Sequence, residues 1–297
     1  MGARVHFEGA GTALPIDNIT GNGTANKVAK FTGTNTIGDG LIDDNGTSVN
    51  NTGAGNIATN TAFGVSALLS NTTGANNIAI GGQSLQNNTT GSDNTASGKA
   101  ALFSNTTGSG NVANGRLSLL YNTSGSSNTA NGTQSLYSNT TGANSTASGA
   151  FALYSNTTGA NNTANGSQSL FSNTTGANNV ASGRNALFSN TTGTNNTASG
   201  VSALQSNTTG SNNAANGGSA LQSNTTGSNN SSLGYNTNSG NFNGSVILGY
   251  NAIATASNQF IVGAITNIAG SVVTVATPRS KVWNVVINGV AQQILLA

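Results

Sequence analysis

A 17-residue repeat dominates the chain. A Thr-Gly or Ser-Gly step recurs without a miss from Gly74 through Gly91 and Gly108 to Gly227, and a second glycine and a leucine recur at the same spacing. The unit reads G-x-x-N-x-A-x-G-x-x-[AS]-L-x-x-N-T-T. Because so short a unit buries its apolar residues only by stacking on copies of itself, the repeat predicts a solenoid. A solenoid of near-identical units favours an architectural role.

Composition argues against an enzyme. Of 297 residues only 5% are charged and 41 are glycine, which is unlike an ordinary globular enzyme. The chain has no cysteine and a single histidine, His6, so thiolate metal sites and most catalytic triads are excluded. Its carboxylates are Glu8, Asp17, Asp39, Asp43, Asp44 and Asp93. A glycan-cleaving solenoid needs a carboxylate pair, and none follows residue 93. We expect no catalytic residue, no cofactor and no metal site.

The charge pattern and the terminal sequence limit the partners. The formal charge is +2, and the eight basic residues, among them Lys99, Arg116 and Arg184, look scattered. Without a basic cluster that follows phosphates, nucleic acid is not an expected partner. The N-terminus lacks a signal-peptide pattern, and no stretch approaches the roughly 18 apolar residues of a membrane helix. We therefore expect neither classical export nor membrane insertion.

The repeat divides the chain into predicted segments. Each unit has two alternating stretches, such as 94–98 and 101–104, separated by glycine-centred turns, which predicts an all-β coil of two strands. Successive coils should pair in parallel at about 4.8 Å. The predicted segments are an N-terminal attachment and hairpin segment (1–52), the β-solenoid (53–234), shorter coils with a period of 14 to 15 (235–270) and an antiparallel C-terminal cap (271–297).

Hairpin signals lie in both terminal segments. Asn288-Gly289 stands between apolar runs and predicts a two-residue hairpin, with Trp283 covering the last coil. Residues 43–46, Asp-Asp-Asn-Gly, predict another hairpin, for which a solvated turn is preferred over a calcium site.

The asparagine of each Asn-Thr-Thr, from Asn71 to Asn224, should form an amide ladder that caps a turn. Glycosylation of these sequons is disfavoured, because sugars on adjacent coils would collide.

A second large side chain follows the repeated leucine. Adjacent strand residues point to opposite faces, so if the leucines fill the coil the second column leaves it. An uncovered apolar stripe of this kind needs a cover. We therefore predict a homotrimer, with an aromatic strip that stacks on sugars as the alternative. The trimer-interface candidates are Phe103, Leu120, Tyr137, Tyr154, Phe171 and Phe188.

The residues after the repeats differ from the array. Aromatic and basic side chains of the kind that anchor interfaces gather there. The receptor-binding candidates are Tyr235, Phe242, Tyr250, Arg279 and Lys281.

Two stretches resemble known fibres. Residues 244–252, GSVILGYNA, resemble the N-S-V-A-I-G motif in heads of trimeric autotransporter adhesins, which implies a parallel β-roll trimer that binds surfaces. Residues 22–49 and 282–290, together with the array, look similar to bacteriophage tail fibres and related bacterial surface fibres. That resemblance implies a shape rather than a site. It also implies a baseplate or other anchoring partner, a cell-surface glycan or protein receptor, and a location in a virion or at the cell surface.

Three functions follow as expectations. The first is a non-enzymatic structural fibre protein, a phage tail fibre or similar appendage for attachment to a host cell. The second is a bacterial trimeric surface adhesin. The third is an ice-binding solenoid, which needs a flat T-x-T array, whereas this array offers adjacent threonines that point to opposite faces of a strand.

Overall fold

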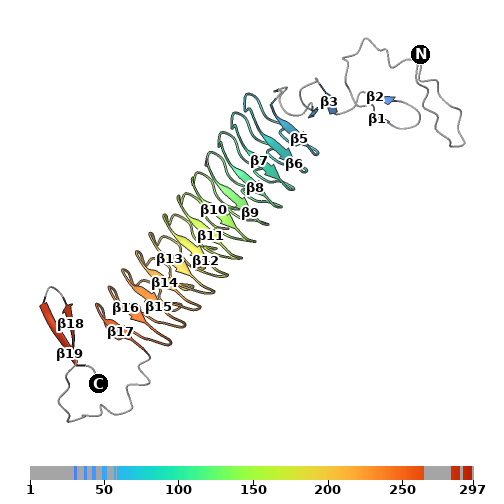
Figure 1. The fold of residues 1–297 in the computed structure, drawn as a ribbon. Coiled ribbons are helices and arrows are strands. Elements are labelled where there is room, and N and C mark those ends of the chain that lie inside the picture. The colour runs from blue at the N-terminus through green and yellow to red at the C-terminus, as the bar shows by residue number, and fades with distance from the viewer. Residues whose placement is uncertain are drawn as a thin grey trace, which may run out of the picture.

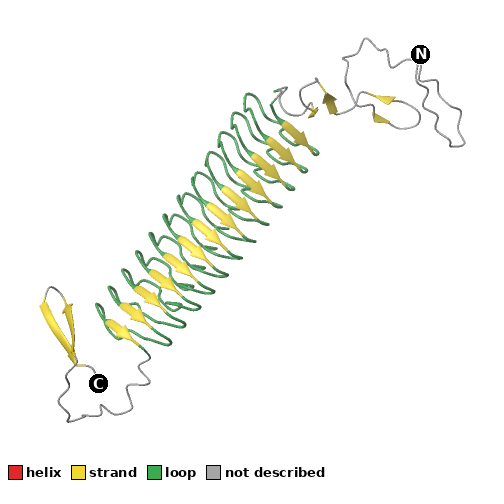
Figure 2. Ribbon diagram, in the orientation of Figure 1, coloured by secondary structure: helices red, strands yellow, loops and turns green. Residues whose placement is uncertain are grey.

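The protein folds as a parallel β-solenoid. The computed structural model describes residues 57 and 59–263 in full, and elsewhere only the strand segments 30–31, 37–38, 42–44, 49–51, 282–287 and 290–295. Residues 59–263 form a straight rod of stacked coils, with all strands on one wall and loops on the others (Figure 1, Figure 2). The prediction of an all-β solenoid is confirmed, and no helix that could cross a membrane occurs among the described residues.

One sheet of 13 parallel strands, β5 to β17, runs along the rod in sequence order. Its strands are β5 (Thr61–Phe63), β6 (Ile78–Ile80), β7 (Thr95–Ser97), β8 (Val112–Asn114), β9 (Thr129–Asn131), β10 (Thr146–Ser148), β11 (Thr163–Asn165), β12 (Val180–Ser182), β13 (Thr197–Ser199), β14 (Ala214–Asn216), β15 (Ser231–Leu233), β16 (Val246–Leu248) and β17 (Phe260–Val262). Thr146 pairs with Thr163 and Ala147 with Ala164, so the register equals the repeat. Beyond β15 the coils shorten, because Ser231 pairs with Val246 and Val246 with Phe260.

Each coil contains one strand, so the prediction of a second strand is wrong. Where the second stretch was predicted, positive φ angles occur two residues apart, at Ala100 (55°) and Leu102 (52°). The stretch therefore curls, although it still bonds to the next coil: the Leu102 N–H donates to the Ser118 carbonyl at 3.0 Å. Alternating side-chain direction comes from alternating backbone handedness rather than from an extended strand. A left-handed leucine costs about 1–2 kcal/mol, and complete burial of its side chain, about 1.5–3 kcal/mol, offsets that cost.

Asparagine side chains fill much of the coil interior. The predicted amide ladder from Asn71 to Asn224 exists, but it lies inside the coil and is almost completely buried. Asn139 Nδ2 donates to Asn122 Oδ1 at 2.7 Å and to the Gly142 carbonyl at 2.9 Å, and Asn139 Oδ1 accepts from Asn156 Nδ2 at 2.8 Å. The ladder therefore bonds along the rod as well as across the turn. The nitrogen that a sugar would occupy is already engaged, which also disfavours glycosylation of the folded array.

A second amide ladder was missed by the sequence interpretation, although the repeat contains its asparagine. It consists of Asn60, Asn77, Asn94, Asn111, Asn128, Asn162, Asn179, Asn196, Asn213 and Asn230, with Ser145 at the one remaining position. Asn128 Nδ2 donates to the Gly142 carbonyl at 2.9 Å, so this carbonyl accepts from both ladders. Asn128 Oδ1 accepts the Ser145 N–H at 3.0 Å. The two ladders hold the first glycine of each repeat between them.

Antiparallel hairpins occur on both sides of the solenoid sequence. Near the N-terminus, β1 (Lys30–Phe31) pairs with β2 (Ile37–Gly38), and β3 (Ile42–Asp44) pairs with β4 (Val49–Asn51). Near the C-terminus, β18 (Val282–Ile287) pairs with β19 (Val290–Leu295), and Ile287 faces Val290. The C-terminal strands thus pair on either side of Asn288-Gly289, as predicted. In the N-terminal hairpin, Asp43 and Asp44 of the predicted turn lie instead within β3 and pair with Asn50 and Val49. The packing of Trp283 and the function of the C-terminal hairpin as a cap lie outside what the structure describes and stay predictions.

Candidate functional site

The predicted apolar stripe partly covers itself. Leu120 is buried, and Phe103, Tyr137, Tyr154, Phe171 and Phe188 are half-buried. Stacked rings account for much of this cover: the centroids of Tyr137 and Tyr154 lie 4.9 Å apart, those of Tyr154 and Phe171 5.1 Å, and those of Phe171 and Phe188 5.0 Å, with interplanar angles of 4–5°. We call these six side chains the aromatic ladder. Their cover comes from the chain's own neighbouring coils, so burial alone no longer demands a partner there.

The geometry of the aromatic ladder bears on sugar binding. A sugar stacks on the face of an aromatic ring, but from Tyr137 to Phe188 each ring lies with a face against the next ring. Both faces of Tyr154 and of Phe171 are closed in this way. A hydrogen bond with Tyr121 raises the pKa of the Tyr137 hydroxyl, and burial adds to the rise, while the charge of Arg116 acts in the opposite direction. Tyrosine hydroxyls and the Arg116 guanidinium therefore share one region of the surface.

The outward face of the β5–β17 sheet is the second candidate surface, and we call it the sheet face. In each strand from β6 to β16 the middle residue is buried and the two flanking residues are at least partly exposed, as in Ile78-Ala79-Ile80. None of the outward residues is charged. Large exposed apolar side chains gather at its two ends: Phe63, Ile78 and Ile80 at one, and Leu233, Val246, Phe260 and Val262 at the other.

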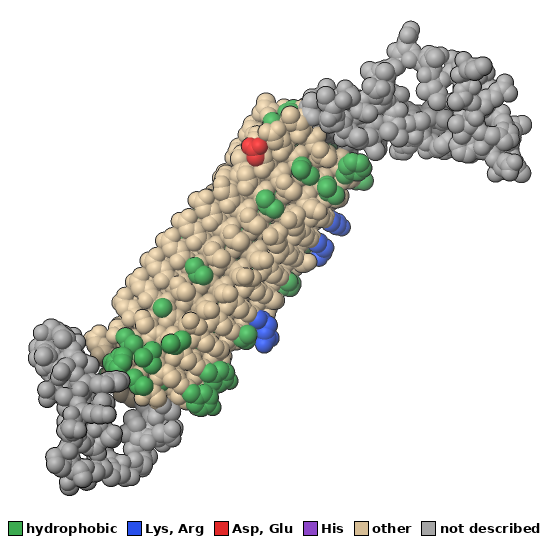
Figure 3. Space-filling model, in the orientation of Figure 1, with side chains coloured by type: hydrophobic (Ala, Val, Ile, Leu, Met, Phe, Trp, Pro, Cys, Tyr) green, Lys and Arg blue, Asp and Glu red, His purple; other side chains and the backbone are tan. Residues whose placement is uncertain are grey.

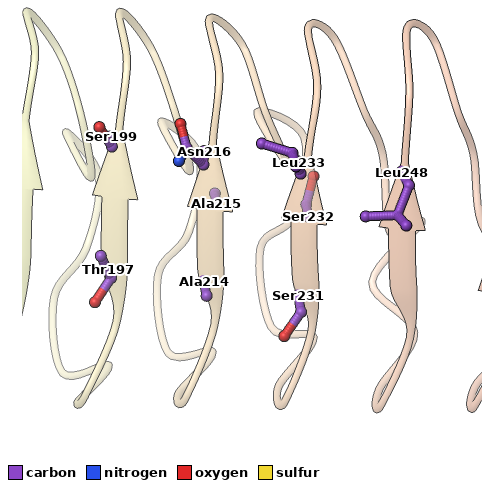
Figure 4. Close-up of a pocket in the computed structure, with 9 residues that line it drawn as sticks. All are labelled: Thr197, Ser199, Ala214, Ala215, Asn216, Ser231, Ser232, Leu233 and Leu248. Atoms are coloured by element: carbon purple, nitrogen blue, oxygen red, sulfur yellow. The ribbon is translucent and has the colours of Figure 1, made fainter.

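A shallow hollow of about 250 Å³ lies on the sheet face over β13–β16 (Figure 4). It forms because Ala214 and Ser231 carry small outward side chains between Thr197 and the coil that holds Leu248. Leu233 projects beside it. Its lining contains no ionisable side chain, so the hollow suits an apolar or hydroxyl-bearing group.

The receptor-binding candidates are only partly brought together. Tyr235 and Tyr250 are 56% and 65% exposed and stack with centroids 5.8 Å apart. Phe242 packs against the core instead, which reduces what it can offer to a receptor. Arg279 and Lys281 lie outside the described residues.

The three basic residues of the solenoid are not scattered, contrary to the sequence interpretation. Lys99, Arg116 and Arg184 all directly follow the second glycine of their repeats, so they fall in one column of the stacked coils. All three are exposed, and the blue side chains lie along one margin of the rod in Figure 3. The shared column could have been predicted from the sequence, because Arg116 lies one full repeat after Lys99. Tyr235, which directly follows Gly234, occupies the same column.

That the chain has no catalytic or metal-binding group stays a prediction, on which only the described residues bear. They contain no cluster of three or more histidine, cysteine, aspartate or glutamate side chains. Asp93 is the sole carboxylate between residues 57 and 263, and its Oδ1 accepts a hydrogen bond from Asn76 Nδ2 at 3.0 Å.

The threonines do not form the array that ice binding needs. Each adjacent Thr-Thr pair lies in a loop, where Thr106 Oγ1 donates to the Thr123 carbonyl at 2.9 Å. On the sheet face, no strand from β5 to β17 has threonine at both outward positions: β7 carries Thr95 and Ser97, and β8 carries Val112 and Asn114.

Comparison with known proteins gives no family for the chain: no protein-family model matches it, and no curated protein matches its sequence.

Proposed function

We propose that this chain is a non-enzymatic structural fibre protein, most simply a phage tail fibre or a similar appendage that attaches to a cell surface. The observation that carries the proposal is the unbroken, in-register sheet from β5 to β17. Backbone hydrogen bonds and two buried amide ladders all run along the rod, so bending it would strain every coil. A bacterial trimeric surface adhesin is the alternative within the same architecture, which the resemblance of residues 244–252 favours.

We further propose that three copies associate in parallel through their sheet faces. The sheet face is uncharged and carries eight of the large exposed apolar side chains: Phe63, Ile78, Ile80, Val180, Leu233, Val246, Phe260 and Val262. Thirteen strands at about 4.8 Å each make it about 60 Å long, enough for an extended interface. The aromatic ladder, the first candidate for this interface, is already covered in part by its own stacking.

Cross-linking from single cysteines should locate the interface, because the native chain has none. Three positions in one coil serve: Thr163→Cys on the sheet face, Phe171→Cys on the aromatic ladder and Ser167→Cys on the column of basic residues. A parallel trimer places identical residues around one axis. A short bis-maleimide should therefore join the Thr163→Cys chains efficiently and the other two poorly. Native mass spectrometry should give three 29.1 kDa chains.

Two results separate the parts of this proposal. Efficient joining of Phe171→Cys chains in place of Thr163→Cys chains would keep the trimer and move the interface to the aromatic ladder. A stable, soluble monomer that cross-links at none of the three positions would end the trimer proposal.

Attachment is assigned to residues 235–297, because the array repeats nearly the same chemistry in every coil while Tyr235 and Tyr250 stand exposed beyond it. Three copies would raise the apparent affinity for a crowded surface through multivalency. A chain that lacks 235–297 but remains trimeric should lose most of its attachment to host cells, measured with labelled fibres. Attachment equal to that of the full chain would refute the assignment.

A further inference from the structure

The basic residues of the solenoid form one exposed column, which we call the basic file: Lys99, Arg116 and Arg184. Neighbouring coils are joined here by their backbones, since the Leu117 N–H donates to the Lys99 carbonyl at 3.0 Å and the Gln134 N–H donates to the Arg116 carbonyl at 3.0 Å. Lys99 and Arg116 therefore lie one coil apart, about 4.8 Å along the rod. Arg184 lies four repeats further on. The basic file thus extends for about 24 Å parallel to the axis.

The basic file contributes no stability that would explain it. Like charges repel, so Lys99 and Arg116, one coil apart, destabilise rather than stabilise the stack. No ion pair links Lys99, Arg116 or Arg184 to another described residue, and Asp93 occupies a different position of the repeat. In a chain with 5% charged residues, chance spacing would place the cations on several walls. A column of unpaired cations on a rigid wall is suited to an anionic ligand that also runs along the rod.

The surface beside the basic file supplies neutral hydrogen-bonding groups. Tyr121 is 48% exposed, and its side chain hydrogen-bonds that of Tyr137, whose pKa responds to the charge of Arg116. Half-buried amides, Gln134 and Gln168, lie in the column between the basic file and the aromatic ladder. Phenol and amide groups donate and accept hydrogen bonds with hydroxyl-rich polymers.

We propose that the basic file and the adjoining tyrosine and glutamine side chains bind a linear anionic polysaccharide laid along the rod. This inference rests on the proposed attachment to cell surfaces, and it adds a second binding surface along the array to the one assigned to residues 235–297. Three cations over about 24 Å match a polymer with sparse charge better than duplex DNA, which carries a charge about every 1.7 Å. Bases of single-stranded nucleic acid need open ring faces, and stacking closes both faces of Tyr154 and Phe171.

Binding of the full chain to dextran sulfate, measured by biolayer interferometry at several salt concentrations, tests the proposal. The triple variant Lys99→Gln, Arg116→Gln and Arg184→Gln should bind at least about tenfold more weakly at low salt and show a shallower salt dependence. The matched control is Arg4→Gln, Lys27→Gln and Lys30→Gln, which lowers the formal charge from +2 by the same three units. The control should bind within about twofold of the native chain. Uncharged dextran should bind to none of them.

Other results would overturn the proposal. Equal losses of dextran sulfate binding in the two triple variants would mean that only the net charge of the chain matters. Equal binding by the native chain and by the basic-file variant would mean that Lys99, Arg116 and Arg184 do not contact the ligand. Stronger binding of duplex DNA than of dextran sulfate, dependent on the basic file, would replace the glycan with nucleic acid. If dextran sulfate fails to bind while full-length fibres still attach to cells, the inference fails and the proposed function stands. If fibres attach to no cell surface, the proposed function fails too.

Discussion

Changing Asn139 to Asp should destabilise the solenoid strongly at neutral pH. The asparagine is fully buried, and its Nδ2 donates to Asn122 Oδ1 and to the Gly142 carbonyl. In the Asn139→Asp variant one carboxylate oxygen would keep the hydrogen bond from Asn156 Nδ2, but the other would face both of these oxygens without a donor. The cations of residues 59–263 are all exposed, so none lies beside it. A buried, unpaired charge typically costs about 3–5 kcal/mol. Urea denaturation followed by circular dichroism should show a lower free energy of unfolding.

The loss of stability in the Asn139→Asp variant should depend on pH. Burial and the facing oxygens would raise the carboxyl pKa in the folded state above its ordinary value of about 3.9. The folded state would then bind the proton more tightly than the unfolded state, so stability rises as the pH falls from the folded pKa toward about 3.9 and is lowest above the folded pKa.

The matched control for this change lies in the same coil. Asn144 is exposed, with a φ of 57° that aspartate also tolerates, so Asn144→Asp should change stability by less than about 0.5 kcal/mol. Equal stability of the Asn139→Asp and Asn144→Asp variants at neutral pH would contradict a buried, fully bonded amide ladder.

The periodicity was sufficient to predict the solenoid, its register and the shorter later coils. The periodicity was informative because equivalent residues of successive repeats stack directly on one another. Spacing in the sequence therefore gives position along the rod: Thr146 pairs with Thr163, and Ser231 pairs with Val246. The same reasoning applied to the cations would have revealed the basic file, since Lys99 and Arg116 are also exactly one repeat apart in the sequence.

The shape of the coil could not be predicted in the same way. The alternating pattern at 101–104 fits an extended strand, but it fits equally well a curled stretch with left-handed residues at Ala100 and Leu102, and leucine has no intrinsic preference for the latter. Burial of Leu102 and the bonds between coils select it, and both are tertiary effects. The error had a consequence for the candidate site. A curled stretch half-buries the side chain after each leucine, so the aromatic ladder is less exposed than a strand would have made it.

The second glycine of each repeat should tolerate no side chain. Gly132 has a φ of 140°, a conformation that L-residues rarely adopt, and a Cβ there would lie 2.6 Å from both the carbonyl carbon and the oxygen of Gly149 in the next coil. Neither atom can yield without separating the coils. Gly132→Ala should therefore combine about 1–3 kcal/mol of backbone strain with a steric clash, and we expect a loss of about 3 kcal/mol or more in the free energy of unfolding.

The chain contains its own control for that substitution. Gly82 has no positive φ, and the nearest atom that its Cβ would meet is the Val65 carbonyl oxygen at 3.9 Å. Gly82→Ala should be neutral or stabilising by about 0.4–1 kcal/mol, because alanine restricts the unfolded chain. Urea denaturation of both variants would measure the difference. A Gly132→Ala variant as stable as Gly82→Ala would show that adjacent coils are further apart than the structure places them, and the shared register of sheet and amide ladders would then be in doubt. A large loss at Gly132 alone would mean that the glycine spacing is set by contact between coils rather than by chain flexibility.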